Sequence, residues 1–427
     1  MVWLRVALLS FGGPAGQIAV MHRIVVEEKQ WVDEQRFMHA LNFCMLLPGP
    51  EAQQLATYLG WLLNGVRGGL VAGILFIVPG FIAILALSFL YAYWLDVSLV
   101  AALFFGLKAA VLALVLLAVK KMAGKALITW PLGVMALFSF VAIAVFGLPF
   151  PLIIVAAAIT GYLWSKQRPH WLGDGLVPAD AWRPESVGKG QALRVLIIGA
   201  LIWALPLLLM LPTLGQDHVL VTEALFFSKV AVVTFGGAYA VLAYIAQQAV
   251  DVYQWLLPGE MLDGLGMAES TPGPLMQVVQ FVGFMAAFRD AAPFSPPVAA
   301  LLGSLVTTWM VFVPCFIFVF AGAPHVERLR HNIAIAGALR GITAAVLGVI
   351  ASLALWFCSH VLFARHQDFS FAGVDLNLPI PASLQWPSLA LLAVALFCLL
   401  KLQWGIGRVL SISVLAGVSL FLAGITG

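Results

Sequence analysis

Long apolar runs alternate with short polar stretches along the whole chain. Uninterrupted apolar runs cover about 68–94, 97–119, 126–146, 149–164, 191–213, 297–322, 333–363, 387–402 and 404–425. About 20 apolar residues are enough for a helix to cross the hydrocarbon core of a bilayer, so these runs predict membrane helices. Polar loops are expected between them, at 120–125, 165–190 and 364–385.

Four further apolar segments are interrupted by glycine or proline. The segments and their breaks are 2–26 at Gly12-Gly13-Pro14, 38–63 at Pro48-Gly49-Pro50, 219–246 at Gly236-Gly237, and 256–288 at Pro272-Gly273-Pro274. Proline removes a backbone donor and glycine relaxes the backbone, so each break predicts a discontinuous helix. Such breaks are tolerated at membrane depth only inside protein or around a wet cavity. Whether the PGP segments span or dip in and return stays open, which gives 12–14 membrane segments.

The second part of the chain repeats the first. At a constant offset of 224, Phe11-Gly12-Gly13 falls on Phe235-Gly236-Gly237, and the two PGP triplets coincide. After an insertion the offset becomes 235, and Val78-Pro79 falls on Val313-Pro314. An ordered set of matches at two fixed offsets indicates an internal repeat. We therefore expect one repeat in 1–164, a polar linker with an extra membrane helix in 165–218, and a second repeat in 219–427.

The charges of the loops differ between the two repeats. The loop 120–125 carries three lysines, whereas its counterpart 361–385 carries one arginine. Residues 22–36 carry three lysines or arginines, whereas 247–260 carry none. Because positive residues favour the cytoplasmic side, this alternation predicts repeats of inverted topology. The expected fold is an all-α polytopic membrane protein built from two inverted homologous repeats.

The composition narrows the class of protein. Of the 427 residues, 63% are hydrophobic and 10% are charged, which excludes an ordinary soluble domain. The net charge of +3 comes without a lysine- or arginine-rich run, so no nucleic-acid partner is expected. The four cysteines, Cys44, Cys315, Cys358 and Cys398, are isolated in apolar stretches and are expected to fill the core rather than bind a metal.

Basic residues inside the apolar runs point to an anion as ligand. Lys108 lies near the middle of 97–119, Lys229 precedes the second FGG, and Arg340 lies early in 333–363. Intramembrane cations are costly and usually functional, and the half-helix that follows each break has a positive N-terminus. Together these features predict a site for an anion or a dianion. The alternative is that the basic side chains reach out to the membrane surface.

Polar residues beside the PGP triplets are further candidates. Gln53 and Gln277, one turn into their half-helices, can donate to oxyanion oxygens. Thr271 is expected to cap the following helix or to contact ligand. Glu51 and Glu269 flank the triplets on opposite sides. Each could carry a coupling proton or offset a lysine, or be a solvated helix cap.

These motifs resemble those of the chromate ion transporter family in its long, two-domain form. The resemblance rests on SFGGPAGQIAVMHRIVVEEKQWVDEQRF and LLPGPEAQQLATYLG in the first repeat, and on TFGGAYAVLAYI, ESTPGPLMQVVQFVG and ALRGITAAVLG in the second. It covers nearly the whole chain. It implies export of chromate across the bacterial inner membrane and resistance to chromate. The less polar sequence after the second PGP suggests that the repeats contribute unequally.

The expected function is a secondary transporter that works by alternating access. Its predicted substrate site comprises Gly12, Gly13, Pro48, Gly49, Pro50, Gln53, Lys108, Lys229, Gly236, Gly237, Thr271, Pro272, Gly273, Pro274, Gln277 and Arg340. Candidate partners are chromate, sulfate (which resembles it), protons, the lipid bilayer and a second copy of the chain. The alternatives are an anion channel or an uptake carrier. No carboxylate dyad, metal cluster, Ser/His/Asp set or ATP-binding motif supports an enzyme or a cofactor.

Overall fold

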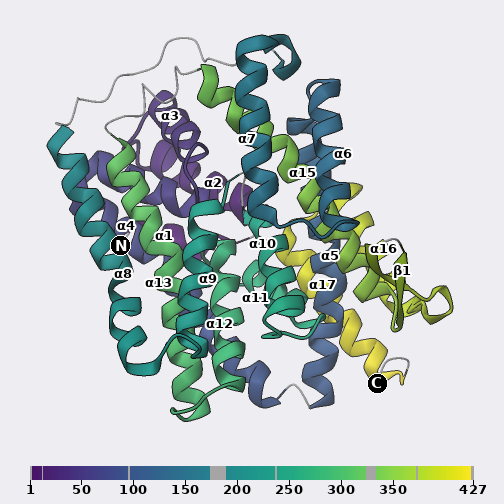
Figure 1. The fold of residues 1–427 in the computed structure, drawn as a ribbon. Coiled ribbons are helices and arrows are strands. Elements are labelled where there is room, and N and C mark those ends of the chain that lie inside the picture. The colour runs from purple at the N-terminus through teal and green to yellow at the C-terminus, as the bar shows by residue number, and fades with distance from the viewer. Residues whose placement is uncertain are drawn as a thin grey trace.

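A computed structural model describes residues 2–11, 13–94, 97–173, 189–235, 238–323, 333–371 and 374–424. These residues form a bundle of helices with one small two-stranded sheet at its edge (Figure 1). Helices long and apolar enough to cross a membrane are Glu51–Trp94, Leu99–Ala126, Ala192–Leu214, Pro296–Gly322 and Ile333–Leu362. The predicted all-α polytopic fold is confirmed.

In chain order, the elements divide between the two segments that the sequence predicts as repeats. The first repeat contains α1 (Val2–Leu9), α2 (Gly13–His22), the π-helical η1 (Arg23–Glu28), α3 (Glu34–Cys44), α4 (Glu51–Trp94), α5 (Ser98–Ala126), α6 (Trp130–Ala144), α7 (Phe150–Gln167) and η2 (Pro169–Leu172). Helix α8 (Lys189–Leu214) follows. The second repeat contains α9 (Val219–Val233), α10 (Ala238–Gln247), the π-helical η3 (Gln248–Val252), α11 (Glu260–Ser270), η4 (Leu275–Gln277), α12 (Val278–Arg289), α13 (Pro296–Gly322), α15 (Ile333–Leu362), β1 (His366–Phe371), β2 (Val374–Pro379), η6 (Pro381–Ser383), α16 (Trp386–Leu400) and α17 (Ile406–Leu422).

Two π-helical turns show how closely the repeats agree. Both η1 and η3 end in a backbone bond between residues five apart, Lys29 N–H to Ile24 O at 3.0 Å and Tyr253 N–H to Gln248 O at 2.8 Å. Each is followed by a glutamine of positive φ, 52° at Gln30 and 54° at Gln254. Because this backbone path is rare outside glycine, its recurrence at the same offset identifies equivalent elements.

Each repeat begins with a helical hairpin whose tip is the FGG region. In the first repeat, Arg5 Nη1 on α1 donates to Glu28 Oε2 on η1 at 2.7 Å. The rings of Trp3 and Trp31 lie 6.3 Å apart, and those of their counterparts Phe227 and Trp255 are also 6.3 Å apart. Since the outer ends of the two arms contact each other, the chain folds back on itself between them.

The PGP triplets lie at the tips of a second pair of hairpins. In the second repeat, Arg289 at the end of α12 donates to Glu260 at the start of α11 at 2.6 Å. In the first repeat, α4 is broken at Asn64 and Gly65, where φ is −142° and 60°. The arms before the triplets, α3 and α11, have 11 residues each and reach about 17 Å. The arms after them reach about 20–24 Å, so each arm is shorter than the roughly 30 Å hydrocarbon core. The two arms of the second PGP segment therefore fold back on each other as a hairpin, and that both PGP segments enter the membrane and return stays a prediction.

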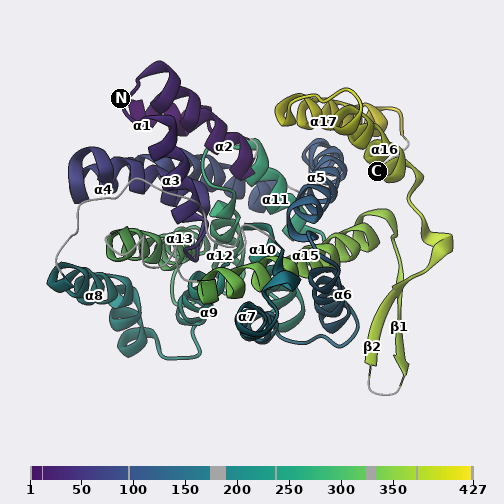
Figure 2. The same cartoon turned by 90° about the horizontal axis from the view of Figure 1, so that it is seen from above.

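The two repeats exchange helices. Helix α7 of the first packs on α15 of the second, and α17 of the second packs on α5 of the first (Figure 2). Glycine allows the helices to approach closely at both crossings. A Cβ at Gly161 would lie 2.3 Å from Gly337 O, and one at Gly417 would lie 2.7 Å from Ala102 O. This reciprocal packing gives an approximate two-fold relation. The inversion of the repeats relative to the membrane stays a prediction.

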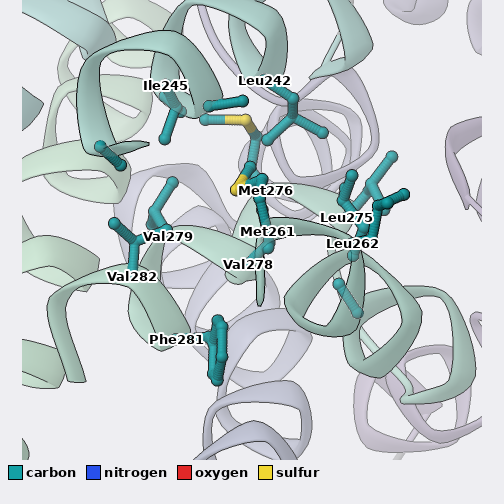
Figure 3. Close-up of a cluster of buried hydrophobic side chains, with 14 of the residues drawn as sticks. Leu242, Ile245, Met261, Leu262, Leu275, Met276, Val278, Val279, Phe281 and Val282 are labelled. Atoms are coloured by element: carbon teal, nitrogen blue, oxygen red, sulfur yellow. The ribbon is translucent and has the colours of Figure 1, made fainter. Parts of the chain in front are cut away.

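Buried apolar side chains hold the hairpins of the second repeat together. Figure 3 shows them converging from α10, α11, η4 and α12. The labelled side chains are Leu242, Ile245, Met261, Leu262, Leu275, Met276, Val278, Val279, Phe281 and Val282, all buried. The packing is close, since a Cβ at Gly264 would lie 2.4 Å from the Phe281 ring. Dense apolar packing of this kind holds the arms of the hairpins in place, whereas the tips are held by backbone hydrogen bonds.

The structure differs from the expectation in all three predicted loops. Helix α5 runs through 120–125 to Ala126, because its lysines are good helix formers with exposed side chains there. The stretch 364–385 contains the antiparallel pair β1 and β2, in the register Phe369 to Leu376, which projects from the bundle in Figure 2. In 165–190, α7 continues to Gln167 and η2 follows, and 174–188 lie outside the described residues.

Candidate functional site

The tips of the hairpins meet across the two repeats. The N–H of Gly49, in the first PGP, donates to Thr234 O at 2.8 Å, and that of Gly273, in the second PGP, donates to Ser10 O at 3.1 Å. Ser10 and Thr234 directly precede the two FGG sequences and are repeat equivalents. The tip of each PGP hairpin is therefore hydrogen-bonded to the residue that precedes FGG in the other repeat. The predicted convergence of the breaks occurs in the described part of the tips; Gly12, Gly236 and Gly237 lie outside it.

The glycines at the tips have backbone conformations that other residues rarely adopt. The φ angles are 74° at Gly13, 125° at Gly49 and 108° at Gly273. A Cβ at Gly49 would lie 2.8 Å from Cys315 Sγ, and one at Gly273 would lie 3.2 Å from Gly80 Cα. Both the angles and the close contacts require glycine here.

Helices start at the tips. Gly13 is the first residue of α2, Pro50 O accepts Gln54 N–H at the start of α4, and Pro274 O accepts Gln277 N–H at the start of η4. Pro48 and Pro272 precede these starts, and Pro272 O lies close to Gly80. Free N–H groups and the helix dipole make such starts favourable places for an anion.

Buried glutamines line the same region. Gln53 Nε2 donates to Thr57 Oγ1 at 3.0 Å, Gln54 Nε2 to Pro48 O at 2.7 Å, Gln17 Nε2 to Gly273 O at 2.6 Å, and Gln277 Nε2 to Gln280 Oε1 at 2.7 Å. The Oε1 atoms of Gln17, Gln53, Gln54 and Gln277 have no hydrogen-bond partner among the described residues. Buried amide oxygens without a donor are unusual. These oxygens are acceptors, so an oxyanion would have to bind through the amide nitrogens or the backbone N–H groups. Gln17 and Gln54 are not among the residues that the sequence predicts, although both are polar residues in apolar segments.

Glu269 and Glu51 have different surroundings. Glu269 is 2% exposed, and its Oε1 accepts the hydroxyl of Tyr239 on α10. Glu51 is the first residue of α4 and is partly buried, and Lys125 on α5 interacts with it electrostatically. Glu269 is therefore not a solvated cap. Thr271 does not cap the following helix, since its hydroxyl turns back to Ala268 O on α11 at 3.5 Å.

Lys108 is paired with a carboxylate that the sequence analysis missed. Its Nζ lies 3.2 Å from Asp263 Oδ2 on α11, and the same oxygen accepts Tyr91 O–H at 2.8 Å. The Asp263 side chain is 1% exposed and that of Lys108 is 31% exposed. The ion pair compensates a buried negative charge on α11 and leaves Lys108 no net charge to offer an anion.

The other two predicted cations lie elsewhere. Arg340 Nη1 donates to Leu172 O at 2.6 Å and to Gly173 O at 3.0 Å, which ties α15 to η2. Lys229 has an exposed side chain on α9. The structure thus gathers the predicted tip residues and does not gather Lys108, Lys229 and Arg340 around them.

The comparisons with known proteins agree on one family. The model of the chromate transporter family matches residues 1–162 and 222–421. A chromate transport protein of Cupriavidus metallidurans is 29% identical over 82% of this chain and 79% of its own length. One of Pseudomonas aeruginosa is 30% identical over 82% and 78%, and a probable chromate transport protein of Synechococcus elongatus is 30% identical over 82% and 81%. No solved structure matches the chain.

Proposed function

Because the chain belongs to the chromate transporter family, we propose that it exports chromate by alternating access and thereby confers resistance to chromate. It is a multi-pass protein of the inner membrane. Its relatives are named transport proteins, which points to a transporter rather than to an enzyme. Chromate and sulfate are both tetrahedral dianions, so sulfate is a competitor in this proposal.

One observation carries the proposal: the reciprocal hydrogen bonds of Gly49 to Thr234 and of Gly273 to Ser10. They bring the helix starts of both repeats to one place, with buried glutamines around it. Paired discontinuous helices that meet between two repeats are typical of secondary transporters. We assign the substrate to this place, with the backbone N–H groups and the second N–H of the Gln53 amide as its ligands. The Gln277 amide already donates to Gln280 and Thr308, so it would have to give up one of these bonds to bind the anion.

The membrane potential is sufficient to drive export. Moving a dianion out of a cell that is negative inside releases about 4.6 kcal/mol at 100 mV, at about 2.3 kcal/mol per charge. That energy supports an outward gradient of about 10³. Transport down the potential needs no nucleotide.

Uptake of chromate into everted membrane vesicles tests the proposal. Respiring everted vesicles are positive inside, so they should accumulate chromate when they contain the protein. Collapse of the potential with valinomycin and potassium should abolish most of the uptake, and sulfate should compete. Equal uptake by vesicles with and without the protein would refute the function, and uptake only under the opposite potential would refute its direction.

A further inference from the structure

Glu269 is placed at the junction of the two repeats. It lies at the end of α11, beside the second PGP, and its Oε1 is bonded to Tyr239. Its Oε2 has no partner in the described part of the chain. A Cβ at Gly13 would lie 3.7 Å from each of the two oxygens. The carboxyl group therefore faces the start of α2 in the other repeat, where an anion would bind in the proposed function.

Two other carboxylates of this region have a cation within ion-pair distance. Asp263 pairs with Lys108 at 3.2 Å, and Glu260 pairs with Arg289 at 2.6 Å. Glu51 interacts electrostatically with Lys125. For Glu269, the residues that the structure describes include no such cation in an ion pair. Its charge is thus left uncompensated, apart from the hydroxyl of Tyr239.

The charged and titratable side chains of the helices that pack against α11 lie near its N-terminal end, away from Glu269. On α5 the facing group is Lys108, on α4 it is Tyr91, and on α12 it is Arg289. All three contact Asp263 or Glu260, about two turns or more from Glu269. Tyr239 on α10 is the titratable group that contacts Glu269 directly.

An ionised Glu269 would repel an oxyanion bound at the start of α2. A carboxylate only accepts hydrogen bonds and repels a second anion, whereas a protonated carboxyl group donates its O–H to an anion oxygen. We propose that Glu269 takes up one proton from water when the oxyanion binds at the tips and returns it when the anion leaves. This inference rests on the proposed function.

Uptake of one proton by Glu269 changes the net charge that is moved across the membrane with each anion. The equivalents of Glu269 and Tyr239 in the first repeat are Met45 and Ala15, so the arrangement occurs in one repeat and supplies one proton. A dianion that moves with one proton carries a net charge of −1. Export then remains driven by the membrane potential, with about half the electrical energy per anion.

Proton uptake on binding tests the proposal. Purified full-length protein in weakly buffered detergent solution is mixed with potassium chromate between pH 7 and 9, with a pH indicator for protons and equilibrium dialysis for chromate. The wild type should take up about one proton per chromate, and its affinity should fall up to tenfold per pH unit as pH rises. Glu269→Gln should bind chromate without proton uptake and with little pH dependence, because the amide donates an N–H.

Glu223→Gln is the matched control. Glu223 on α9 is also fully buried, and its two oxygens lack partners among the residues described, but it lies about three turns from Thr234. This variant should keep the wild-type proton uptake. Loss of uptake in Glu223→Gln, or its retention in Glu269→Gln, would overturn the assignment to Glu269.

Two further results separate the possible failures. Wild-type protein that binds no chromate would refute the proposed function itself, whereas binding without proton uptake would refute the proton site alone. If Glu269→Gln does not fold, Tyr239→Phe keeps the carboxyl group and removes its hydrogen-bond donor. That variant should still take up one proton, with a displaced pH midpoint, and an unchanged midpoint would overturn the proposal.

Discussion

Gly273 shows what a single residue does at the centre of this molecule. Its φ of 108° turns the chain at the tip, and its N–H bonds to Ser10 in the other repeat. Gly49 does the same toward Thr234 with a φ of 125°. Such angles cost an L-residue about 1–3 kcal/mol, so the tips depend on glycine for both shape and contact.

We predict that Gly273→Ala abolishes most chromate transport. The new Cβ would lie 3.2 Å from Gly80 Cα at a φ that alanine rarely adopts, so the tip must move away from Ser10. We expect a loss of about 1–3 kcal/mol in stability as well. Vesicle uptake and thermal unfolding measure the two effects.

Gly147→Gln is the control for this substitution. Gly147 also has a positive φ, 58°, in the turn before α7, but a Cβ there meets open space. The matching turn before α17 holds Gln403 at a φ of 51°. This variant should transport normally and lose about 1–2 kcal/mol in stability. A Gly273→Ala protein as active as Gly147→Gln would contradict the role given to the tip.

Lys108 offers a second residue-scale prediction. Lys108→Met leaves Asp263 buried without its cation, which should destabilise the protein by about 3 kcal/mol. The double variant Lys108→Met with Asp263→Asn removes both charges and should recover folding and transport. If the folded double variant lacked transport, Lys108 would belong to the substrate site as the sequence suggests.

The sequence predicts the tips better than their surroundings. FGG and PGP are local patterns, so their break positions follow directly from glycine and proline chemistry. The partners of Lys108 and Arg340 lie 155 or more residues away, in Asp263, Leu172 and Gly173. Such pairings depend on tertiary packing. No local sequence pattern shows that Lys108 is paired with a carboxylate or that Arg340 is hydrogen-bonded to backbone carbonyls.

At the scale of elements, the sequence does not predict that the chain folds back into a hairpin at each break. The breaks are visible, but a chain can continue or turn back after a break. The deciding contacts are between arm ends, such as Arg289 with Glu260, and they are 29 residues apart. The π-helical turns and the β1–β2 pair were also missed, because neither has a strong apolar period.

Two glycine substitutions in α5 test the close contact between α5 and α17. A Cβ at Gly106 would lie 2.1 Å from Ser413 O, so Gly106→Ala should push the helices apart and cost about 1–3 kcal/mol. Gly124→Ala, on the same helix and with open space around it, should stabilise by about 0.5–1 kcal/mol. Thermal unfolding distinguishes them; equal effects would contradict the close crossing.

His22 links the first two hairpins in a pH-dependent way. Its Nε2 lies 2.5 Å from Glu34 Oε2, and this hydrogen bond raises the pKa of His22 above its ordinary value. The link is therefore fully present below about pH 6.5 and is lost as pH rises through the raised pKa. Its contribution should be below about 1 kcal/mol.

The stability difference between wild type and His22→Gln measures this link. The melting temperature of the wild type should exceed that of the variant at pH 5.5, and the difference should shrink toward pH 9. A difference that is constant over this range, or that grows with pH, would contradict the assignment. Glu34→Gln should remove most of this pH-dependent part, because Glu27 also contacts His22, at 3.1 Å from its Nδ1.

At the scale of the whole molecule, the repeats are interlocked rather than set side by side. Helices α7 and α17 each pack on the long helix of the other repeat. The offsets in the sequence predict the pairing of equivalent elements but not this exchange, because repeat matches carry no information on which copies touch. The halves cannot separate freely, so we expect alternating access to come from movement of the hairpins around their tips.

Counterflow of chromate into proteoliposomes tests the central claim most directly. Vesicles loaded with unlabelled chromate are diluted into a trace of radiolabelled chromate, with the membrane potential clamped at zero. A carrier with one site at the meeting tips predicts a transient accumulation of label above equilibrium, saturable in chromate and absent in Gly273→Ala. Label that only rises to equilibrium, with a flux linear in chromate concentration, would contradict the account.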